Sequence, residues 1–407
     1  MASSSNNFSD TLNANFKEIY AKRIENLIPD GVKGLNKIPF AARDKQLGNL
    51  YHQPVILGLE HGVTFAGATD DAFNLEAPVS GVIRDAQVRG TQMVLRSVLG
   101  YAAAARAAGG GDKAFEDSTK FLVANMLRSI TKKLEITLFY GQVGYAQVAS
   151  VASNTITVTT AEWAPGIWAG ATSMPIEIRD ASGNLRGTTS VTSVDMDART
   201  IDVVAMPAGV VATDVIWHRG AFGNEFAGIH KILTNTGTIF NIDAAQYDLF
   251  KGNSISAGSA ALQLDDVERA IARGVEKGLD SDVMVFVNPR AWNDLLTEQT
   301  AKRQFDHSYS PESMKNGAKA ITFYGQSGMI EILPSIYVKE GFAYVLCSDE
   351  WMRIGSTDVT FRRPGQGEEF FRELENSAGY ELRAYTDQAL FCYAPGKNTL
   401  ITDIVNT

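Results

Sequence analysis

The chain has 407 residues, of which 45% are hydrophobic and 20% charged, and its formal net charge is −9. This composition is typical of a folded protein and excludes a disordered one. The negative charge disfavours binding to phosphate backbones, and no apolar run is long enough to cross a membrane. The opening residues, MASSSNNFSD, lack the basic flank and apolar stretch of a signal peptide, so we expect no export by that route.

The first hundred residues divide into a polar segment and a strand-like one. Residues 1–53 are mixed in character, and an amphipathic helix is predicted between Asp10 and Pro29. Residues 54–100 contain two strand-like stretches on either side of a polar tip. The stretches are PVILGLEHGVTFA and GVIRDAQVRGTQMVLRSVLGY, and the tip is GATDDAFNLEAP. This arrangement predicts one long hairpin.

A long helix is predicted after the three glycines at 109–111. Asp112, Glu116 and Asp117 lie in its first turn and Gly141 follows its last, as the helix dipole and C-cap preferences favour. At about 1.5 Å per residue, the helix is a rod of roughly 43 Å. Side chains of one face recur at helical spacing at positions 115, 119, 122, 126, 130, 134 and 138.

Residues 142–220 differ from the rest of the chain. They contain no lysine and three of the five tryptophans, and short Thr- and Val-rich strands alternate with turns. This pattern predicts a small β-barrel or sandwich inserted after the helix, with Trp163, Trp168 and Trp217 in its core. The ends of the insert, 141–142 and 219–220, are expected to lie close together. The alternative is a long meander woven into a neighbouring sheet.

The remainder has an α+β pattern. A helix with Leu264, Val267, Ile271, Val275 and Leu279 on one face precedes the buried strand VMVFV and a second helix that begins after Asn288-Pro289. The strands MIEILP, AYVLCS and WMRIG follow. Three long strands are predicted at the end, in EEFFRELEN, GYELRAYT and QALFCYAP.

The sequence contains no pattern that indicates catalysis, a cofactor site or a metal site. The glycines at 109–111 are not followed by Gly-Lys-Ser/Thr, and Ser327 is not in a GxSxG motif. Asp195 and Asp197 have calcium-loop spacing but lack the required glycine, so a hairpin turn is expected there. None of the histidines is paired in a zinc motif; they stand at 52, 61, 218, 230 and 307. We therefore predict that the chain is not an enzyme.

Two further groups of residues have a structural interpretation. The glutamates at 368, 369, 373 and 375 alternate with Arg372 and Phe370-Phe371, which favours an ion-paired strand face. Cys347 and Cys392 lie in apolar, strand-like runs. Buried reduced thiols are expected there rather than a disulfide or a nucleophile.

The order of these elements resembles that of the major capsid proteins of tailed double-stranded DNA phages, which have the Hong Kong 97 fold. The resemblance covers nearly the whole chain outside 142–220, and its most specific stretches are VFVNPRAWNDL and YELRAYTDQALFCYAPGKNTL. It places Asn288-Pro289 in the scaffold of the axial domain. It implies an N-terminal arm at 1–53, an extended loop at 54–111, a spine helix at 112–141, a peripheral return at 221–260, an axial domain at 261–350, and peripheral strands with a closing axial strand at 351–407.

The resemblance also implies a function. The chain would assemble with itself into hexamers and pentamers of an icosahedral head around double-stranded DNA, in the virion, after assembly in the host cytoplasm. A portal and a possible decoration protein would be further partners. Because only about 50 polar residues precede the hairpin, we expect a separate scaffolding protein and little cleavage beyond Met1. Some relatives cross-link a lysine of the extended loop, but residues 54–100 contain none, so we expect a non-covalent shell.

Two alternatives stay open. The first is an encapsulin-type nanocompartment shell protein, against which the long arm and the large insert weigh. The second is an oligomeric enzyme with a carbohydrate-binding β insert, for which a cleft lined by carboxylates would be evidence.

Overall fold

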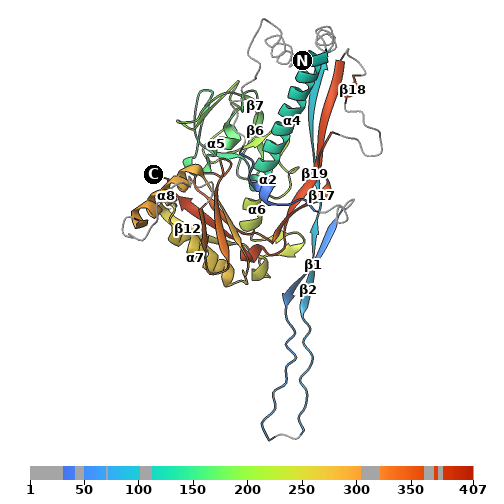
Figure 1. Cartoon of the computed structure of the whole chain (residues 1–407), viewed down its shortest axis with the longest axis vertical. Helices are drawn as coiled ribbons and strands as arrows, with labels where there is room; N and C mark the ends of the chain where they lie inside the picture. Colours follow the sequence, from blue (N-terminus) through green and yellow to red (C-terminus); the bar gives the residue numbers. More distant parts are fainter. Residues whose placement is uncertain are drawn as a thin grey trace.

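A computed structural model describes residues 31–41, 50–69, 72–100, 112–303, 321–361, 371–374 and 379–406. The chain forms a body from which one long hairpin projects (Figure 1). Several features of the sequence analysis lie outside the described residues. They are the helix before Pro29, the glycines at 109–111, His307, and the glutamates at 368, 369 and 375.

The hairpin contains β1 (Tyr51–Gly58) and β2 (Val82–Val88), which pair antiparallel, and residues 59–69 and 72–81 prolong its two arms away from the body (Figure 1). The prediction that its second arm continues to Gly100 is wrong. β3 (Thr91–Gly100) leaves the hairpin and pairs along its whole length with β19 (Gly379–Cys392). Gly90 lies between β2 and β3. A Cβ atom added at Gly90 would stand 2.3 Å from Asp387 Oδ1. The chain therefore crosses from one sheet to another at a residue without a side chain.

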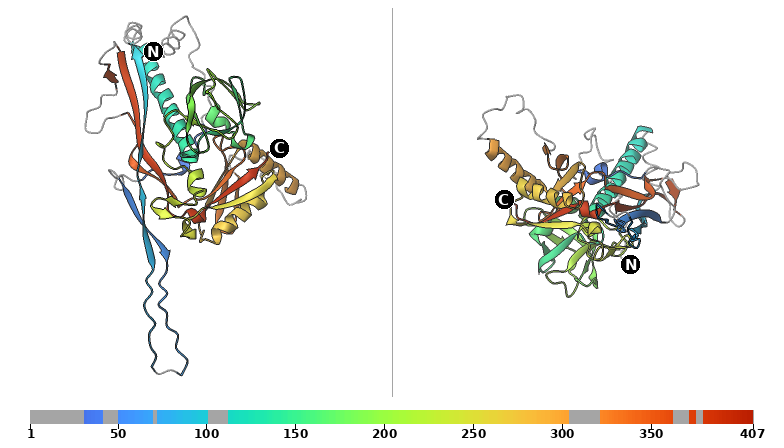
Figure 2. Two further views of the ribbon diagram at one scale, coloured as in Figure 1. Left: turned by 180° about the vertical axis from the view of Figure 1, so that it is seen from behind. Right: turned by 90° about the horizontal axis from the view of Figure 1, so that it is seen from below.

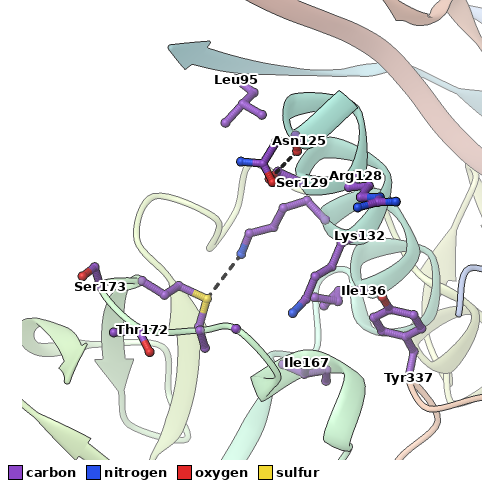
Figure 3. A pocket seen from close by; sticks show the side chains of 14 residues that line it. Leu95, Asn125, Arg128, Ser129, Lys132, Ile136, Ile167, Thr172, Ser173 and Tyr337 are labelled. Carbon is purple, nitrogen blue, oxygen red and sulfur yellow. Dashed lines mark hydrogen bonds between the residues drawn. The ribbon is translucent and has the colours of Figure 1, made fainter. Parts of the chain in front are cut away.

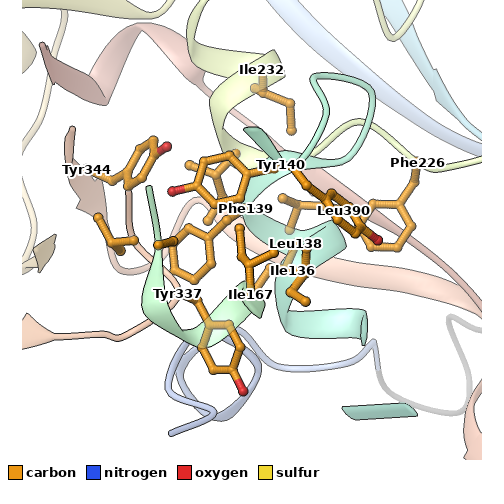
Figure 4. Close-up of a cluster of buried hydrophobic side chains, with 14 of the residues drawn as sticks. Ile136, Leu138, Phe139, Tyr140, Ile167, Phe226, Ile232, Tyr337, Tyr344 and Leu390 are labelled. Carbon is orange, nitrogen blue, oxygen red and sulfur yellow. The ribbon is translucent and has the colours of Figure 1, made fainter. Parts of the chain in front are cut away.

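The spine helix α4 (Asp112–Tyr140) has the predicted 29 residues. It runs beside β3 and β19 on one side and the inserted barrel on the other (Figure 2). The described members of its predicted apolar face are all buried: Leu122, Met126, Ile130, Leu134 and Leu138. Its last turn enters the main core, where Phe139 and Tyr140 contact aromatic side chains such as Tyr344 (Figure 4). The helix thus has one buried face along its described earlier turns and is buried on all sides over its last residues, 134–140.

A four-stranded sheet beside α4 consists of β3, β19, β17 (Trp351–Thr360) and β18 (Phe371–Glu373). The prediction of two separate strands at 379–392 is wrong, because β19 is continuous through Thr386 and Asp387. These polar residues suggested a break, but Thr386 is buried and its hydroxyl accepts a 2.6 Å hydrogen bond from Gln388 Nε2. Gln388 in turn accepts a bond from Arg353 Nη1 on β17. Hydrogen bonds inside the sheet therefore permit polar side chains in a buried strand.

A six-stranded mixed sheet forms the second part of the body, with α7 (Leu264–Val275) and α8 (Pro289–Arg303) beside it (Figure 1). β12 belongs to this sheet, so the assignment of all of 221–260 to the peripheral part is wrong; β12 pairs parallel with β20. The strand order is β12 (Asn253–Ala260), β20 (Thr399–Ile404), β16 (Ala343–Cys347), β13 (Val283–Val287), β15 (Met329–Pro334), β14 (Ile321–Tyr324).

Asn288 and Pro289 form a structural corner at the end of β13. The Asn288 side chain accepts a 2.9 Å hydrogen bond from the backbone N–H of Arg290 and donates one of 2.8 Å to the Val338 carbonyl. It is almost fully buried. Asn288 therefore caps α8, and Pro289 occupies the first helical position, where its missing N–H costs no hydrogen bond.

The insert is a closed six-stranded barrel and not a meander woven into the peripheral sheet. Its first and last strands pair with each other, Ala146 opposite Ile216, so its two ends are adjacent. Its strands, in barrel order, are β4 (Ala146–Ala152), β5 (Thr155–Val158), β8 (Thr200–Val203), β7 (Leu185–Asp195), β6 (Pro175–Arg179), β9 (Val215–His218). Its buried interior consists of Val148, Ile156, Val158, Ile176, Ile178, Val191, Ile201, Val203 and Ile216.

The barrel core is continuous with the core of the body. Trp163 and Trp168 are buried and stacked, with ring centroids 6.1 Å apart, in the segment between β5 and β6. Backbone hydrogen bonds join this segment to residues 336–341, which connect β15 to β16, from Gly166 to Ile336 and from Glu340 to Trp163. The two tryptophans therefore lie where the barrel meets the body. In the described part of the chain, no helix is long and apolar enough to span a membrane.

Candidate assembly surfaces

The projecting hairpin exposes large apolar side chains. Phe65 is 91% exposed, Leu75 80% and Leu59 73%. Ile56, Val63, Phe73, Val79 and Ile83 are also more than half exposed. A two-stranded hairpin has too little apolar contact to be stable alone, and exposed apolar patches of this kind mark interaction surfaces. The hairpin is therefore the first candidate for contact with another molecule.

The same hairpin is acidic. Between Leu59 and Gly81 the chain contains Glu60, Asp70, Asp71 and Glu76 and neither lysine nor arginine. Glu60 and Glu76 are exposed, and neither forms an ion pair within the described residues. A partner surface for this segment must combine apolar area with positive charge.

A buried carboxylate on the spine helix holds residues 33–35 of the N-terminal arm. Glu135 accepts hydrogen bonds from the backbone N–H groups of Lys33, Gly34 and Leu35, at 3.0, 2.7 and 2.8 Å. These groups begin the short helix α2 (Gly34–Lys37), whose first N–H groups have no partner inside the helix. Burial raises the pKa of Glu135, and the three backbone donors oppose that rise. The arm is thus attached to α4 at one defined place.

Arg353 holds the next part of the arm. Its Nε donates a 3.0 Å bond to the carbonyl of Ile38, and its backbone exchanges hydrogen bonds with Pro39 and Ala41. The guanidinium also donates to Asp358 at 2.9 Å. The arm therefore extends the contact from α4 to the edge of the long strand β17.

Two ion pairs join the barrel to the segment between β15 and β16. Lys339, almost fully buried, pairs with Glu162 and donates a 3.2 Å bond to the carbonyl of Gly144. Its neighbour Glu340 pairs with Arg199, on the turn before β8, at 2.8 Å. Because both pairs cross from the insert to residues 339–340, the barrel has a fixed orientation on the body.

A chain of polar groups lies between α4 and the base of the barrel. Lys133 Nζ is 3.4 Å from the hydroxyl of Tyr145, and that hydroxyl is 3.5 Å from Glu225 Oε1. The other oxygen of Glu225 is buried and has no hydrogen-bond partner among the residues that the structure describes. Burial lowers the pKa of Lys133 to about 7 and raises the pKa of Glu225 to about 7. A cavity of about 300 Å³ adjoins this cluster.

A second cavity, of about 280 Å³, opens between α4 and the barrel loop at 170–174. Arg128 and Lys132 lie on α4, and Thr172 and Ser173 lie on the facing loop (Figure 3). Lys133 also lines this cavity, and its amino group is 3.7 Å from Met174 Sδ. Apolar side chains complete the wall, namely Leu95, Ile136, Ile167, Ala171, Met174 and Tyr337. The described lining therefore combines apolar, neutral polar and cationic side chains and includes no carboxylate.

The structure does not bring the described histidines together. His52 lies on the hairpin, 2.6 Å from Asp85, whereas His230 is at the main core with its Nδ1 3.0 Å from the Tyr344 hydroxyl. Burial lowers the pKa of both His218 and His230 to about 4. Within the described ranges, no group of three potential metal ligands is present.

The Asp195 turn and the two cysteines have the predicted structural roles. Asp195 Oδ1 accepts bonds from the N–H groups of Asp197 and Ala198, both at 2.9 Å, so this stretch is a hairpin turn between β7 and β8. Cys347 and Cys392 are buried free thiols. Sequence reasoning did not find Glu135 or Lys133, because a charged residue on a helix gives no sign of which residue elsewhere in the chain is its partner.

The hairpin, the spine helix, the sheet of long strands and the six-stranded sheet with its helices together define the Hong Kong 97 fold of phage capsid proteins. The capsid asymmetric unit of cyanophage A-1(L) is similar to this chain, with a TM-score of 0.54 and 12% identity over 95% of this chain and 97% of that one. At this identity the likeness establishes the fold.

Two further solved structures are similar at lower scores. The capsid of Myoviridae phage XM1 has a TM-score of 0.49 and 10% identity, over 96% of this chain and 98% of that one. The holo-SrpI encapsulin complex from Synechococcus elongatus PCC 7942 has a TM-score of 0.43 and 8% identity, over 94% of this chain and 92% of that one. No family model and no curated protein matches the sequence.

Proposed function

We propose that the chain is the major capsid protein of a tailed double-stranded DNA phage and assembles into the hexamers and pentamers of an icosahedral head. The single observation that carries the proposal is the apolar, projecting hairpin on a capsid fold, with Phe65 91% and Leu75 80% exposed. A lone chain that exposes so much apolar side-chain area is incomplete, and repeated copies of itself provide the cover. The role is structural, not enzymatic.

The charge of the chain suits a container for DNA. At a net charge of −9, a wall of this protein gains little from contact with phosphate, so the genome is held without sequence specificity and without strong adhesion. The partners that accompany this role are a separate scaffolding protein, a portal and a decoration protein. Assembly takes place in the host cytoplasm, and the finished protein resides in the virion capsid.

The lysine content of the hairpin supports a non-covalent shell. Residues 54–100 contain no lysine, so this segment has no amine that could form an isopeptide bond. The remaining attractions are burial of apolar side chains and charge pairing between copies.

An encapsulin-type shell has the same fold, and its contents distinguish it from a phage head. The enzyme alternative has less support, because the described lining of the two cavities beside α4 includes one carboxylate, Glu225. A pair of carboxylates is the usual requirement for hydrolysis of a glycosidic bond.

Co-expression of the chain with its scaffolding protein, followed by negative-stain microscopy, tests the proposal. We expect closed shells, and a chain that stays monomeric or forms only small oligomers would contradict it. The paired variant Phe65→Ser with Leu75→Ser should abolish shells while the chain stays folded. Val204→Ser, at an exposed apolar residue on the barrel, is the matched control and should assemble normally. DNA inside particles from infected cells, rather than a cargo enzyme, separates the phage head from the encapsulin.

A further inference from the structure

A cleft of about 730 Å³ lies between α7, the edge strand β12 and residues 233–236. Its described lining includes four cations and one carboxylate. The cations are Lys251, Arg269, Arg273 and Lys277, and the carboxylate is Asp248. The chain as a whole has a net charge of −9. The cleft is therefore a local concentration of positive charge in an acidic protein.

Two exposed arginines of α7 keep hydrogen-bond donors for a ligand. The Arg269 side chain is 54% exposed and pairs with Asp266 at 2.9 Å, and Arg273 is 61% exposed and pairs with Glu276 at 3.0 Å. A guanidinium has five N–H donors, and each of these arginines uses one of them in its pair. The two arginines stand one helical turn apart, about 6 Å along the axis. Their other N–H groups have no acceptor among the described residues, so oxygen atoms of a ligand could occupy them.

The two lysines leave an excess of positive charge. Lys277 pairs with Asp248 at 3.0 Å and also donates to the backbone carbonyls of Asp248 and Lys251. Lys251 forms no ion pair within the described part of the chain. The four cations of the cleft thus have three carboxylate partners, which leaves one positive charge unbalanced.

The rest of the described lining is mostly polar. Ser254, Ser256 and Thr236 are exposed, whereas the apolar members are Leu233, which is buried, and Ile255, which is half-buried. Arginine, lysine, serine and threonine side chains are the usual contacts of nucleic-acid phosphates. A protein partner would instead need a large apolar or aromatic anchor at the centre of its contact. The cleft therefore suits phosphate oxygens better than a folded protein surface.

The six-stranded sheet separates this cleft from the barrel. Successive side chains of β13 point to opposite faces of the sheet. Val283 and Val285 belong to the core that includes the buried side of α7, whereas Met284 and Phe286 belong to the core that includes the barrel interior. The barrel and α7 therefore lie on opposite sides of the sheet.

We infer that the barrel stands on the outer surface of the shell and that the α7 cleft faces the lumen, where it binds phosphate groups of the packaged double-stranded DNA. The inference rests on the proposed function and adds to it the face of the chain that meets the genome. Densely packed DNA leaves little room for a protruding domain inside the shell. With one unbalanced charge in each cleft, a single contact is weak and salt-sensitive, and many copies around the wall act together. A wall of this kind holds the genome without strong adhesion.

Duplex binding to the unassembled chain tests the cleft. The anisotropy of a fluorescent DNA duplex is measured over a range of salt concentrations. Arg269→Gln and Arg273→Gln should each weaken binding by roughly tenfold at about 50 mM salt and reduce the slope of log K against log salt by about 1. Arg96→Gln is the matched control, because Arg96 is 58% exposed, pairs with Glu381 and lies on β3, outside the lining of the cleft. Equal weakening in all three variants would mean that net charge alone acts, and would overturn the site.

Photochemical cross-linking tests the orientation in assembled particles. The photoreactive amino acid p-benzoyl-phenylalanine is incorporated at Ser256, which is exposed beside the cleft, or at Val204, which is exposed on the barrel. Irradiation of DNA-filled particles should link DNA to the chain at position 256 and not at position 204. Empty shells are the control for background. A link at position 204 alone would place the barrel inside and overturn the inference.

The outcomes separate the two proposals. Wild-type chains that form no shells overturn the proposed function, and the duplex measurement on the unassembled chain still reports on the cleft. Normal DNA-filled shells without a link at position 256 overturn the cleft as a DNA contact and leave the proposed function intact. A polyglutamate peptide that needs Arg269 for binding, while the duplex does not, would assign the cleft to an acidic protein segment. Inorganic phosphate that binds there while the duplex does not would assign it to a free anion. Either result overturns the inference.

Discussion

The Glu135 carboxylate accepts a 2.7 Å hydrogen bond from the backbone N–H of Gly34, 101 residues earlier in the chain. The contact leaves no room for a side chain at position 34, where a Cβ atom would stand 2.7 Å from Leu138 Cδ2. Glu135 and Leu138 both lie on the last turns of α4. The arm therefore reaches the spine helix where the helix enters the main core.

Replacement of Glu135 tests this attachment. Glu135→Ala leaves the N–H groups of Lys33, Gly34 and Leu35 without their acceptor, and we expect a loss of about 1–3 kcal/mol in the free energy of unfolding. Denaturant titration of the unassembled chain measures it. Glu331→Ala is the control, because it removes the exposed pair of Glu331 with Lys37 on the same arm and should cost less than about 1 kcal/mol. Equal losses in the two variants would contradict the role of Glu135.

Glu225 should make stability depend on pH. Its pKa in the folded chain is raised to about 7 by burial, so the folded state holds the proton more tightly than the unfolded state. The resulting stabilisation is fully present below about pH 4.5 and is lost as the pH rises through 7. Lys133, Tyr145, Gln142 and Glu177 are the groups that act on this carboxyl.

In the Glu225→Gln variant, the loss of folding stability between pH 4.5 and 7 should disappear. The variant should be more stable than the wild type at pH 8 by roughly 1–3 kcal/mol. The melting temperature across that pH range is the measurement. Glu268→Gln, an exposed glutamate on α7, should leave the wild-type profile unchanged. A parallel profile for Glu225→Gln and the wild type would show that this carboxyl does not titrate in the window.

The shell should be held without covalent bonds. Since residues 54–100 contain no lysine, mature particles boiled in detergent should run as one band at the 44.1 kDa mass of the chain. A ladder of multimers from unmodified particles would refute the prediction.

The barrel should fold as a unit. It is closed, its ends are adjacent, and nine Val and Ile side chains fill its interior. We expect residues 142–221, expressed alone, to give a β-type circular dichroism spectrum and a cooperative thermal transition. Trp163 and Trp168 lose their cover from residues 336–341 in the fragment, so their fluorescence should indicate greater exposure than in the full chain. An unfolded fragment would mean that the body completes the barrel.

The regular parts of the fold could be predicted from the sequence alone. The repeat of Leu122, Met126 and Ile130 every four residues defines the buried face of α4, because a helix brings such positions into one line. The run VMVFV predicted a strand buried on both faces, and Asn288-Pro289 predicted the start of α8. These signals are local, since each depends on spacing within one element.

Tertiary structure decided which distant residues meet. β3 continues the apolar pattern of the hairpin, yet it pairs with β19 almost 300 positions away, and Gly90, just before β3, lies close to Asp387 of β19. Thr386 and Gln388 look like a break in a strand until their hydrogen bonds are known: Gln388 donates to Thr386 and accepts a bond from Arg353. The lysines at 132 and 133 resemble an ordinary solvated pair until the loop at 170–174 covers them. A charge or a polar side chain does not encode its partner, because burial and hydrogen bonding are set by segments that are remote in the sequence.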